Sequence, residues 1–355
     1  MNLESLRRKR VKRIGLKNTG HTGQRRIFFI LDRATRKFSG DLGLWMQYID
    51  FARKQKANKR LPQILSTVLR LHPTNAELWI HAAHYALDER SDIAEARNSM
   101  QRGLRFCSNS KHLWCEYTKL EMIYMSRVSA RGRLFQQHGS GEDSNMTLPT
   151  LDIKEFDSET FGHIDKGVLD ELQKTPALSG AIPIAIFNAA MKQFPQDSDL
   201  GKQLFDVIAQ FQEIPCVSRV LRHIVQSLQD AAPQSPSTMI CFFREPVSCV
   251  KPVSTYFPTA LRESLSRLRT SMETLSTSSS RETNAQRRGV FACEVVKWTL
   301  DSLESEHPEL DQDICKALMA VLKKTCMYTS ERFLHLVHGR LTHRSCLTSK
   351  DNSSS

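Results

Sequence analysis

The chain has 355 residues and a formal net charge of +12, with 40% hydrophobic and 25% charged residues. This composition is typical of a folded protein and excludes a chain that is disordered throughout. The charged amino terminus and the lack of any run near the roughly 20 apolar residues of a membrane span argue against secretion and membrane insertion. Nine cysteines form no CxxC pair, so we expect reduced thiols in the cytosol or nucleus.

The first forty residues are strongly basic, with twelve Lys or Arg against two acids, a net charge of +10. Residues 1–14 have the apolar spacing of a basic helix, and a break is expected between Gly15 and Gly23. Three interpretations remain for its densest cluster: a nuclear or nucleolar targeting signal, contacts with RNA phosphates or an acidic partner, or a solvated helix face. No aromatic residues separate the basic ones, so any RNA contact would be to the RNA backbone and without sequence preference. The cluster consists of Arg7, Arg8, Lys9, Arg10, Lys12 and Arg13.

A tryptophan recurs at a nearly fixed interval. Trp45, Trp79 and Trp114 are spaced by 34 and then 35 residues, and each begins a stretch with apolar or aromatic residues three and six positions later. A fixed period of this length predicts stacked pairs of helices. Apolar or small residues also recur 15, 14 and 11 positions before each tryptophan, which predicts a second helix in every unit.

The predicted unit is therefore a helix A that begins near the tryptophan, a turn, a helix B and another turn. A single helix pair cannot bury its apolar face alone, so neighbouring units must stack. The tryptophans could line a ligand-binding face, but their helical spacing in every unit favours a role in the core.

The tryptophan pattern stops after residue 135. Residues 136–180 are predicted to be an acidic linker or insertion, because nine acids face two lysines between residues 142 and 171. Residues 181–230 show three apolar stripes and are interpreted as degenerate helical repeats.

The remainder of the chain has less regular patterns. Residues 231–290 contain five prolines and a polar stretch from Ser276 to Arg288, so we expect a mostly irregular segment with one helix between Leu261 and Leu275. Residues 291–340 are predicted to form a helical pair, and residues 341–355 a disordered polar tail.

No recognised catalytic motif occurs in the sequence. GxxxxGK[ST], GxSxG, HExxH and GxGxxG are all absent, so we predict a protein that is not an enzyme and needs no cofactor. His335, His338, His343 and Cys346 are residue types that bind zinc, but such spacing is common by chance in a basic tail. We therefore predict no metal site.

The tryptophan-led segments resemble the half-a-TPR (HAT) repeat of RNA-processing scaffolds. The third copy matches best, since Trp114, Tyr117 and Leu120 are followed by the glutamate typical of the motif. The resemblance implies an all-α solenoid of helix-pair repeats over residues 1–135. The positions that match the motif have structural roles in that family: Trp45, Tyr48, Trp79, Tyr85, Trp114, Tyr117 and Glu121.

Within that family, residues 1–15 and 30–54 resemble the HAT-repeat subunits of the small-subunit processome. Those proteins are longer, so we expect a short or incomplete form. The resemblance implies a nucleolar, non-enzymatic scaffold that supports pre-rRNA processing to 18S rRNA, with WD40-propeller subunits, U3 snoRNA and pre-rRNA as partners. It implies neither a membrane nor a small-molecule substrate. Two alternatives remain: a HAT-repeat scaffold in pre-mRNA splicing or 3′-end processing, and a basic module that binds RNA backbone.

Overall fold

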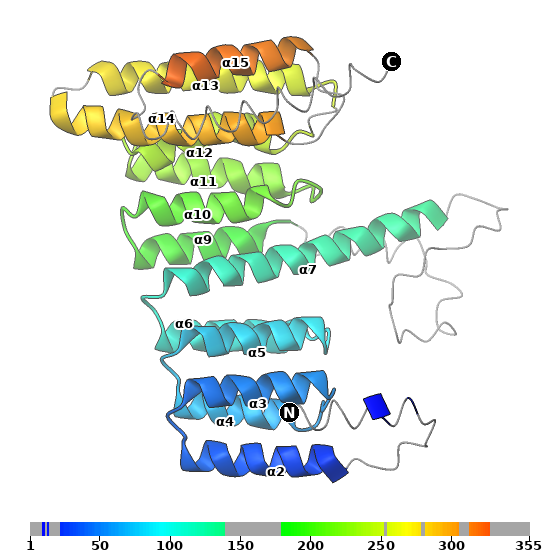
Figure 1. Cartoon of the computed structure of the whole chain (residues 1–355). Helices are drawn as coiled ribbons and strands as arrows, with labels where there is room; N and C mark the ends of the chain where they lie inside the picture. Colours follow the sequence, from blue (N-terminus) through cyan, green and yellow to red (C-terminus); the bar gives the residue numbers. More distant parts are fainter. Residues whose placement is uncertain are drawn as a thin grey trace. The chain divides into compact units, whose positions relative to one another are not determined.

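The predicted all-α class, built from repeated helix pairs, is confirmed. The computed structural model describes residues 9–10, 13, 22–138, 179–251, 254–277, 281–304 and 312–326. All regular secondary structure in these residues is helical (Figure 1). None of the described helices is long and apolar enough to cross a membrane.

The helices form two compact units, Met1–Leu113 and Trp114–Ser355. The division lies at the start of α7 (Lys111–His138) and differs from the array end expected at residue 135. The array was expected to end at residue 135 because the tryptophan pattern stops there. In the observed division α7 is linked to later residues by Cys115, whose thiol contacts Gln203, and by Arg133, which pairs with Glu213.

The first unit is a stack in which each helix packs against the next one along the chain. α2 (Thr22–Lys37) packs on α3 (Leu42–Lys54), followed by α4 (Leu61–Leu71), α5 (Ala76–Asp88) and α6 (Ile93–Phe106). The tryptophan-led A helices are α3 and α5, and the B helices are α4 and α6. Each tryptophan lies three residues after the start of its helix.

Aromatic rings fill the beginning of this stack. The Phe28 ring of α2 packs on Phe51 and Tyr48 of α3, with centroid distances of 5.0 Å and 6.2 Å. Leu61 and Val68 of α4 are buried in the same cluster. Buried apolar area of this kind is the main source of stability, at about 25 cal/mol per Å².

The second unit continues the arrangement of paired helices. Besides α7, its described helices are α9 (Ala181–Gln193), α10 (Ser198–Ala209), α11 (Val217–Ala231), α12 (Pro236–Ser248), α13 (Phe257–Thr277), α14 (Arg281–Glu304) and α15 (Gln312–Cys326). From α9 onward, consecutive helices contact each other. α9 also contacts α11, α10 contacts α12, and α12 contacts α14. Contacts between nearest and next-nearest helices are the signature of stacked pairs in two layers.

The same four-residue turn recurs in both units. In each copy the first residue ends a helix by donating its backbone N–H to the residue four positions earlier, and the fourth residue donates its N–H back to the first residue's carbonyl. Asp, Asn or Ser occupies the fourth position, where these residues favour the start of the next helix. The turns are Phe38–Asp41, His72–Asn75, Cys107–Ser110, Phe194–Asp197 and Ala232–Ser235.

The expectation that residues 231–290 are mostly irregular is wrong. α12, α13 and the start of α14 fill most of this range. Pro236 lies in the first turn of α12, where its missing N–H costs no helical hydrogen bond. The prolines therefore separate and begin helices, and their number alone was a poor guide.

Pro246 lies inside α12, where it leaves the carbonyl of Phe242 without its helical donor. The Arg267 side chain of α13 donates to that carbonyl with an N···O distance of 3.0 Å. Ser264 of α13 likewise donates to the carbonyl of Phe243. The Arg267 side chain thus supplies the hydrogen bond that the proline removes.

The polar stretch from Ser276 to Arg288 was also expected to be disordered, yet α13 runs to Thr277 and α14 begins at Arg281. α14 therefore starts before the expected residue 291. Leu275 at the end of α13 and Phe291 of α14 are buried in one cluster, which favours helix on both sides. Most of the predicted helix 1–14, the acidic linker from residue 139 to 178, and residues 327–355 lie outside the described residues.

Candidate interaction surface

The first two tryptophans occupy the same local environment. The Nε1 of Trp45 donates to the Ser39 carbonyl at 2.9 Å, and the Nε1 of Trp79 donates to the Pro73 carbonyl at 2.8 Å. Both side chains are buried, at 4% and 6% exposure. In each unit the accepting carbonyl lies six residues before the tryptophan. These two indoles therefore hydrogen-bond their A helices to the turns that precede them.

The capping residue lies four positions before each tryptophan. Asp41 accepts from the backbone N–H of Leu44 at 3.2 Å, and Asn75 accepts from that of Glu77 at 3.0 Å. Ser110 accepts from the N–H of Leu113 at 3.3 Å. These caps satisfy N–H groups that the helix leaves unpaired, so the turn sequence sets where each A helix starts.

A second contact reaches the same carbonyls from the end of the B helix of the same unit. His72 Nε2 lies 2.6 Å from the Ser39 oxygen, and Cys107 Sγ lies 3.5 Å from the Pro73 oxygen. His72 and Cys107 each lie seven residues before the next tryptophan. One carbonyl therefore receives the indole of the A helix and the side chain that ends the B helix of the same unit, so both helices of a unit are tied to one turn.

Trp114 departs from this pattern. Its indole is buried, but its Nε1 has no hydrogen-bond partner among the described residues. Tyr117 and Glu121 of the same helix are also buried. The third copy therefore keeps its core position without the indole–carbonyl contact.

Tyr48 lies three residues after Trp45, and Tyr85 lies six residues after Trp79. Both tyrosines are buried. Burial is the largest cause that raises the pKa of both hydroxyls. A nearby carboxylate raises each pKa further, that of Asp32 for Tyr48 and that of Glu89 for Tyr85. The Tyr85 hydroxyl is buried and has no hydrogen-bond partner in the described part of the chain. All seven motif positions named from the sequence therefore lie in the interior of their units.

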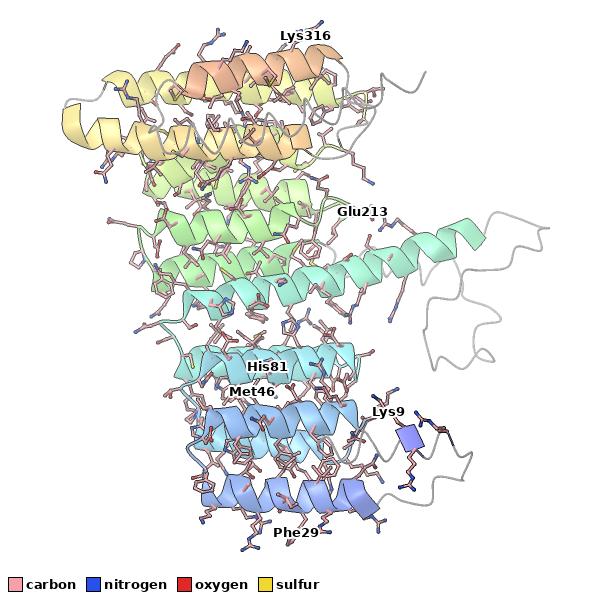
Figure 2. All side chains as sticks on the ribbon, in the orientation of Figure 1. Lys9, Phe29, Met46, His81, Glu213 and Lys316 are labelled. Atoms are coloured by element: carbon pink, nitrogen blue, oxygen red, sulfur yellow. The ribbon has the colours of Figure 1, made fainter. Side chains whose placement is uncertain are left out.

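The basic amino-terminal cluster is only partly described. Lys9, Arg10 and Arg13 have helical backbone and are exposed, whereas Arg7, Arg8 and Lys12 lie outside the described residues. The described basic residues therefore face solvent, as a contact surface requires. Phe29 of α2 is also 66% exposed and points away from α3 (Figure 2).

An arginine also recurs with the repeat, which the sequence analysis overlooked. Arg36, Arg70 and Arg105 each lie nine residues before a tryptophan, and all three are exposed on α2, α4 and α6. Counting back nine positions in the same register would have found them. Arg70 and Arg105 line the same hollow of the first unit, whereas Arg36 pairs with Asp32 of its own helix at 2.7 Å.

A groove of about 650 Å³ lies between α4 and α6. Residues of α5, including Trp79 and Tyr85, form its floor, and Arg70 and Arg105 line it. This groove is a hollow of the first unit with both apolar and basic lining. It is the clearest candidate for binding a partner in the described residues.

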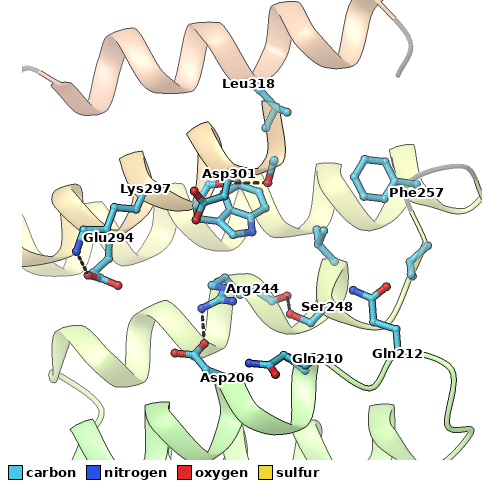
Figure 3. Close-up of a pocket in the computed structure, with 15 residues that line it drawn as sticks. Asp206, Gln210, Gln212, Arg244, Ser248, Phe257, Glu294, Lys297, Asp301 and Leu318 are labelled. Carbon is cyan, nitrogen blue, oxygen red and sulfur yellow. Dashed lines mark hydrogen bonds and ion pairs between the residues drawn. The ribbon is translucent and has the colours of Figure 1, made fainter. Parts of the chain in front are cut away.

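The second unit has a hollow of about 540 Å³ between α10, α12 and α14 (Figure 3). Its charged groups pair with one another: Asp206 with Arg244 at 2.6 Å, and Glu294 with Lys297 at 2.8 Å. Glu294 also pairs with Lys202 of α10 at 2.5 Å. Burial raises the pKa of Glu294, but hydrogen bonds from the two lysines outweigh burial and hold it below its usual value. The Asp206–Arg244 and Glu294–Lys202 pairs connect helices, the Glu294–Lys297 pair lies within α14, and none is arranged as a nucleophile with a base.

Three of the described thiols are poorly suited to nucleophilic chemistry. Burial raises the pKa of Cys241 to about 12, and that of Cys115 and Cys249 to about 11. A thiol with such a pKa stays protonated near neutral pH and reacts slowly. Within the described ranges no three His, Cys, Asp or Glu residues could hold a metal ion. The four zinc-ligand candidates after residue 334 lie outside those ranges.

No family model matches the chain. The chain is similar to U3 small nucleolar RNA-associated protein 6. The Schizosaccharomyces pombe protein of that name is 36% identical over 151 residues, which are 41% of this chain and 31% of the relative. The Dictyostelium discoideum homolog is 25% identical over 197 residues, covering 54% of this chain and 32% of the relative. The Homo sapiens homolog is 29% identical over 112 residues, which are 32% of this chain and 19% of the relative. The matches thus span about a third or less of these relatives.

Proposed function

We propose that this chain is a non-enzymatic HAT-repeat scaffold of the small-subunit processome in the nucleolus. In this role it supports pre-rRNA processing to 18S rRNA by holding protein and RNA components together. Its partners are WD40-propeller subunits and U3 snoRNA or pre-rRNA. The tryptophan register and the repeated turn support the HAT assignment.

The similarity to proteins named for association with U3 small nucleolar RNA carries this proposal. The fold supports it, because stacked helix pairs offer extended surfaces for macromolecules. The paired charges of the hollow in the second unit and the protonated thiols offer no evident catalytic group in the described residues.

Affinity purification of the tagged full chain from cells tests the proposal. We expect U3 snoRNA, measured by quantitative PCR, and WD40-propeller proteins, measured by mass spectrometry, to be enriched over an untagged control. Imaging of the same chain should place it in nucleoli. Enrichment of spliceosomal or 3′-end-processing proteins without U3 snoRNA would overturn the assignment and favour the alternative scaffold.

A basic RNA-backbone-binding module is the second candidate, and the exposed Lys9, Arg10 and Arg13 favour it. It predicts crosslinking of the full chain to RNA that falls steeply with salt, because phosphate contacts release counterions. Changing the six basic residues between Arg7 and Arg13 to glutamine should then abolish most of the crosslinking. Unchanged crosslinking would eliminate this candidate.

A further inference from the structure

The groove between α4 and α6 has an apolar floor. Trp79, Ala82 and Ala86 of α5 line it, together with Leu65 and Leu69 of α4. Its walls are the B helices of successive units, so it is the furrow that stacking leaves between two equivalent helices. Its volume of about 650 Å³ is large enough to take several side chains.

The rim of the groove is basic. Arg70 of α4, Arg90 after α5, and Arg102 and Arg105 of α6 line it, and all four are exposed. Glu95 is the one acid among the lining residues. Arg70, Arg102 and Arg105 form no ion pair within the described residues. The rim therefore holds guanidinium groups available for carboxylates, which they bind in a bidentate geometry.

The floor also contains an unpaired polar group. Tyr85 lines the groove and is 5% exposed, and its hydroxyl has no partner in the described part of the first unit. Buried polar groups are almost always hydrogen-bonded in folded proteins. An unpaired hydroxyl beneath a groove therefore points to an acceptor that arrives with a ligand.

We propose that this groove binds an acidic amphipathic helix of a protein partner. Apolar side chains on one face of that helix lie on the floor formed by α5, and carboxylates on its flanks reach the arginines of α4 and α6. The apolar floor requires a hydrophobic face, and the unpaired arginines require negative charge. This inference stands on the groove alone and does not rest on the processome assignment.

Single-stranded RNA fits the groove less well. RNA-binding grooves combine positive charge with aromatic platforms on which bases stack. Phe106 is 56% exposed, but its ring already stacks on Trp79 with a centroid distance of 5.8 Å and an interplanar angle of 9°. The rest of the floor is largely aliphatic. An amphipathic helix uses this floor, whereas a base does not.

Fluorescence anisotropy with the full chain tests the proposal. The probe is a labelled synthetic peptide of about 15 residues, or four helical turns, with Leu and Phe at i, i+3, i+4 and i+7 and Glu elsewhere. A scrambled peptide of equal composition and charge spreads the apolar residues around the helix. We expect the amphipathic peptide to bind more tightly than the scrambled one. The double variant R70E/R105E should weaken its binding by about tenfold.

The matched control is R25E/R33E, which reverses two exposed arginines of α2 that do not line the groove. It should change affinity by less than about twofold, as expected for distant screened charges. The exposed Phe106→Ala provides a second groove variant and should also weaken binding. Circular dichroism establishes that all variants fold.

Three results would overturn the proposal: no binding of the amphipathic peptide, equal binding of the scrambled peptide, or equal loss in the control variant. Labelled poly(U) is measured in parallel. RNA binding that depends on Arg70 and Arg105, without peptide binding, would reassign the face to RNA.

Discussion

The indole of Trp79 and the thiol of Cys107 share one acceptor, the carbonyl oxygen of Pro73, at 2.8 Å and 3.5 Å. Trp79 belongs to the unit that contains this carbonyl, and Cys107 ends the B helix of that unit before the next tryptophan. Trp45 and His72 share the Ser39 carbonyl in the same way. A carbonyl oxygen has two lone pairs, so one turn can hold its own helix and orient the next.

The first prediction concerns the central indole. Trp79→Ala should lower the free energy of unfolding by about 3–5 kcal/mol, because it removes a buried aromatic ring and leaves a cavity. Urea titration followed by circular dichroism measures the change. Trp298→Ala is the comparison. Trp298 is only partly buried, and its ring centroid lies 5.4 Å from that of Phe243, so this change should lower the free energy of unfolding by less. Equal losses would contradict the repeat register.

Gly103 of α6 is a second test of how closely the helices pack. A methyl group at this position would lie 2.9 Å from Cβ and Cγ of Trp79 and 3.3 Å from Leu113. Gly103→Ala should therefore destabilise the protein by about 1–3 kcal/mol, although alanine favours helix. A shift in thermal unfolding measures this. Gly40→Ala is the matched control, since nothing lies within 4 Å of its added methyl group. A stabilising Gly103→Ala would show that the helices can separate freely.

The unpaired hydroxyl of Tyr85 supports a third prediction. Tyr85→Phe removes a buried polar group that has no partner in the described residues and keeps the ring. The free energy of unfolding should rise by about 1 kcal/mol, because the desolvation cost of the hydroxyl disappears. Chemical denaturation of the free chain measures the change. A clear loss of stability would mean that the hydroxyl has a partner in the folded chain.

The fourth prediction is a pH dependence from Glu294. Its pKa is below the usual 4.5, since the hydrogen bonds from Lys202 and Lys297 outweigh the effect of burial. A depressed carboxyl pKa adds stability that is complete above the unfolded pKa and is lost as the pH falls through the folded pKa. Glu294→Gln should cost about 1 kcal/mol at neutral pH. The difference from the wild type should shrink below pH 4.5. A difference independent of pH would show that charge is not its cause.

Sequence periodicity was sufficient for the first unit because its signals are local. A tryptophan at a 34–35-residue interval, a capping residue four positions before it and a B helix behind it all lie within one unit. The same register contained Arg36, Arg70 and Arg105, which were overlooked because apolar positions alone were compared.

Where the tryptophans disappear, the apolar stripes of residues 181–230 still predicted helices, and α9, α10 and α11 lie there, but the repeat register was no longer visible. Four residues after the caps Asp197 and Ser235, the tryptophan position is occupied by Gly201 and Met239. A methyl group on Gly201 would lie 2.5 Å from Leu228, so this leucine of α11 occupies the space next to the helix. The repeated turn survives there, but its short polar signature is too common to identify a repeat by itself.

The order of residues alone therefore determined the helical class, the register of the tryptophans and the turns that start each A helix, because capping and helical spacing act over a few residues. Only the tertiary structure decided that residues 236–248 are helical despite Pro246, and that four arginines surround an apolar groove. The carbonyl released by the proline meets Arg267 of the next helix, and the groove exists only between neighbouring helix pairs. Both depend on contacts between segments that no local pattern reports.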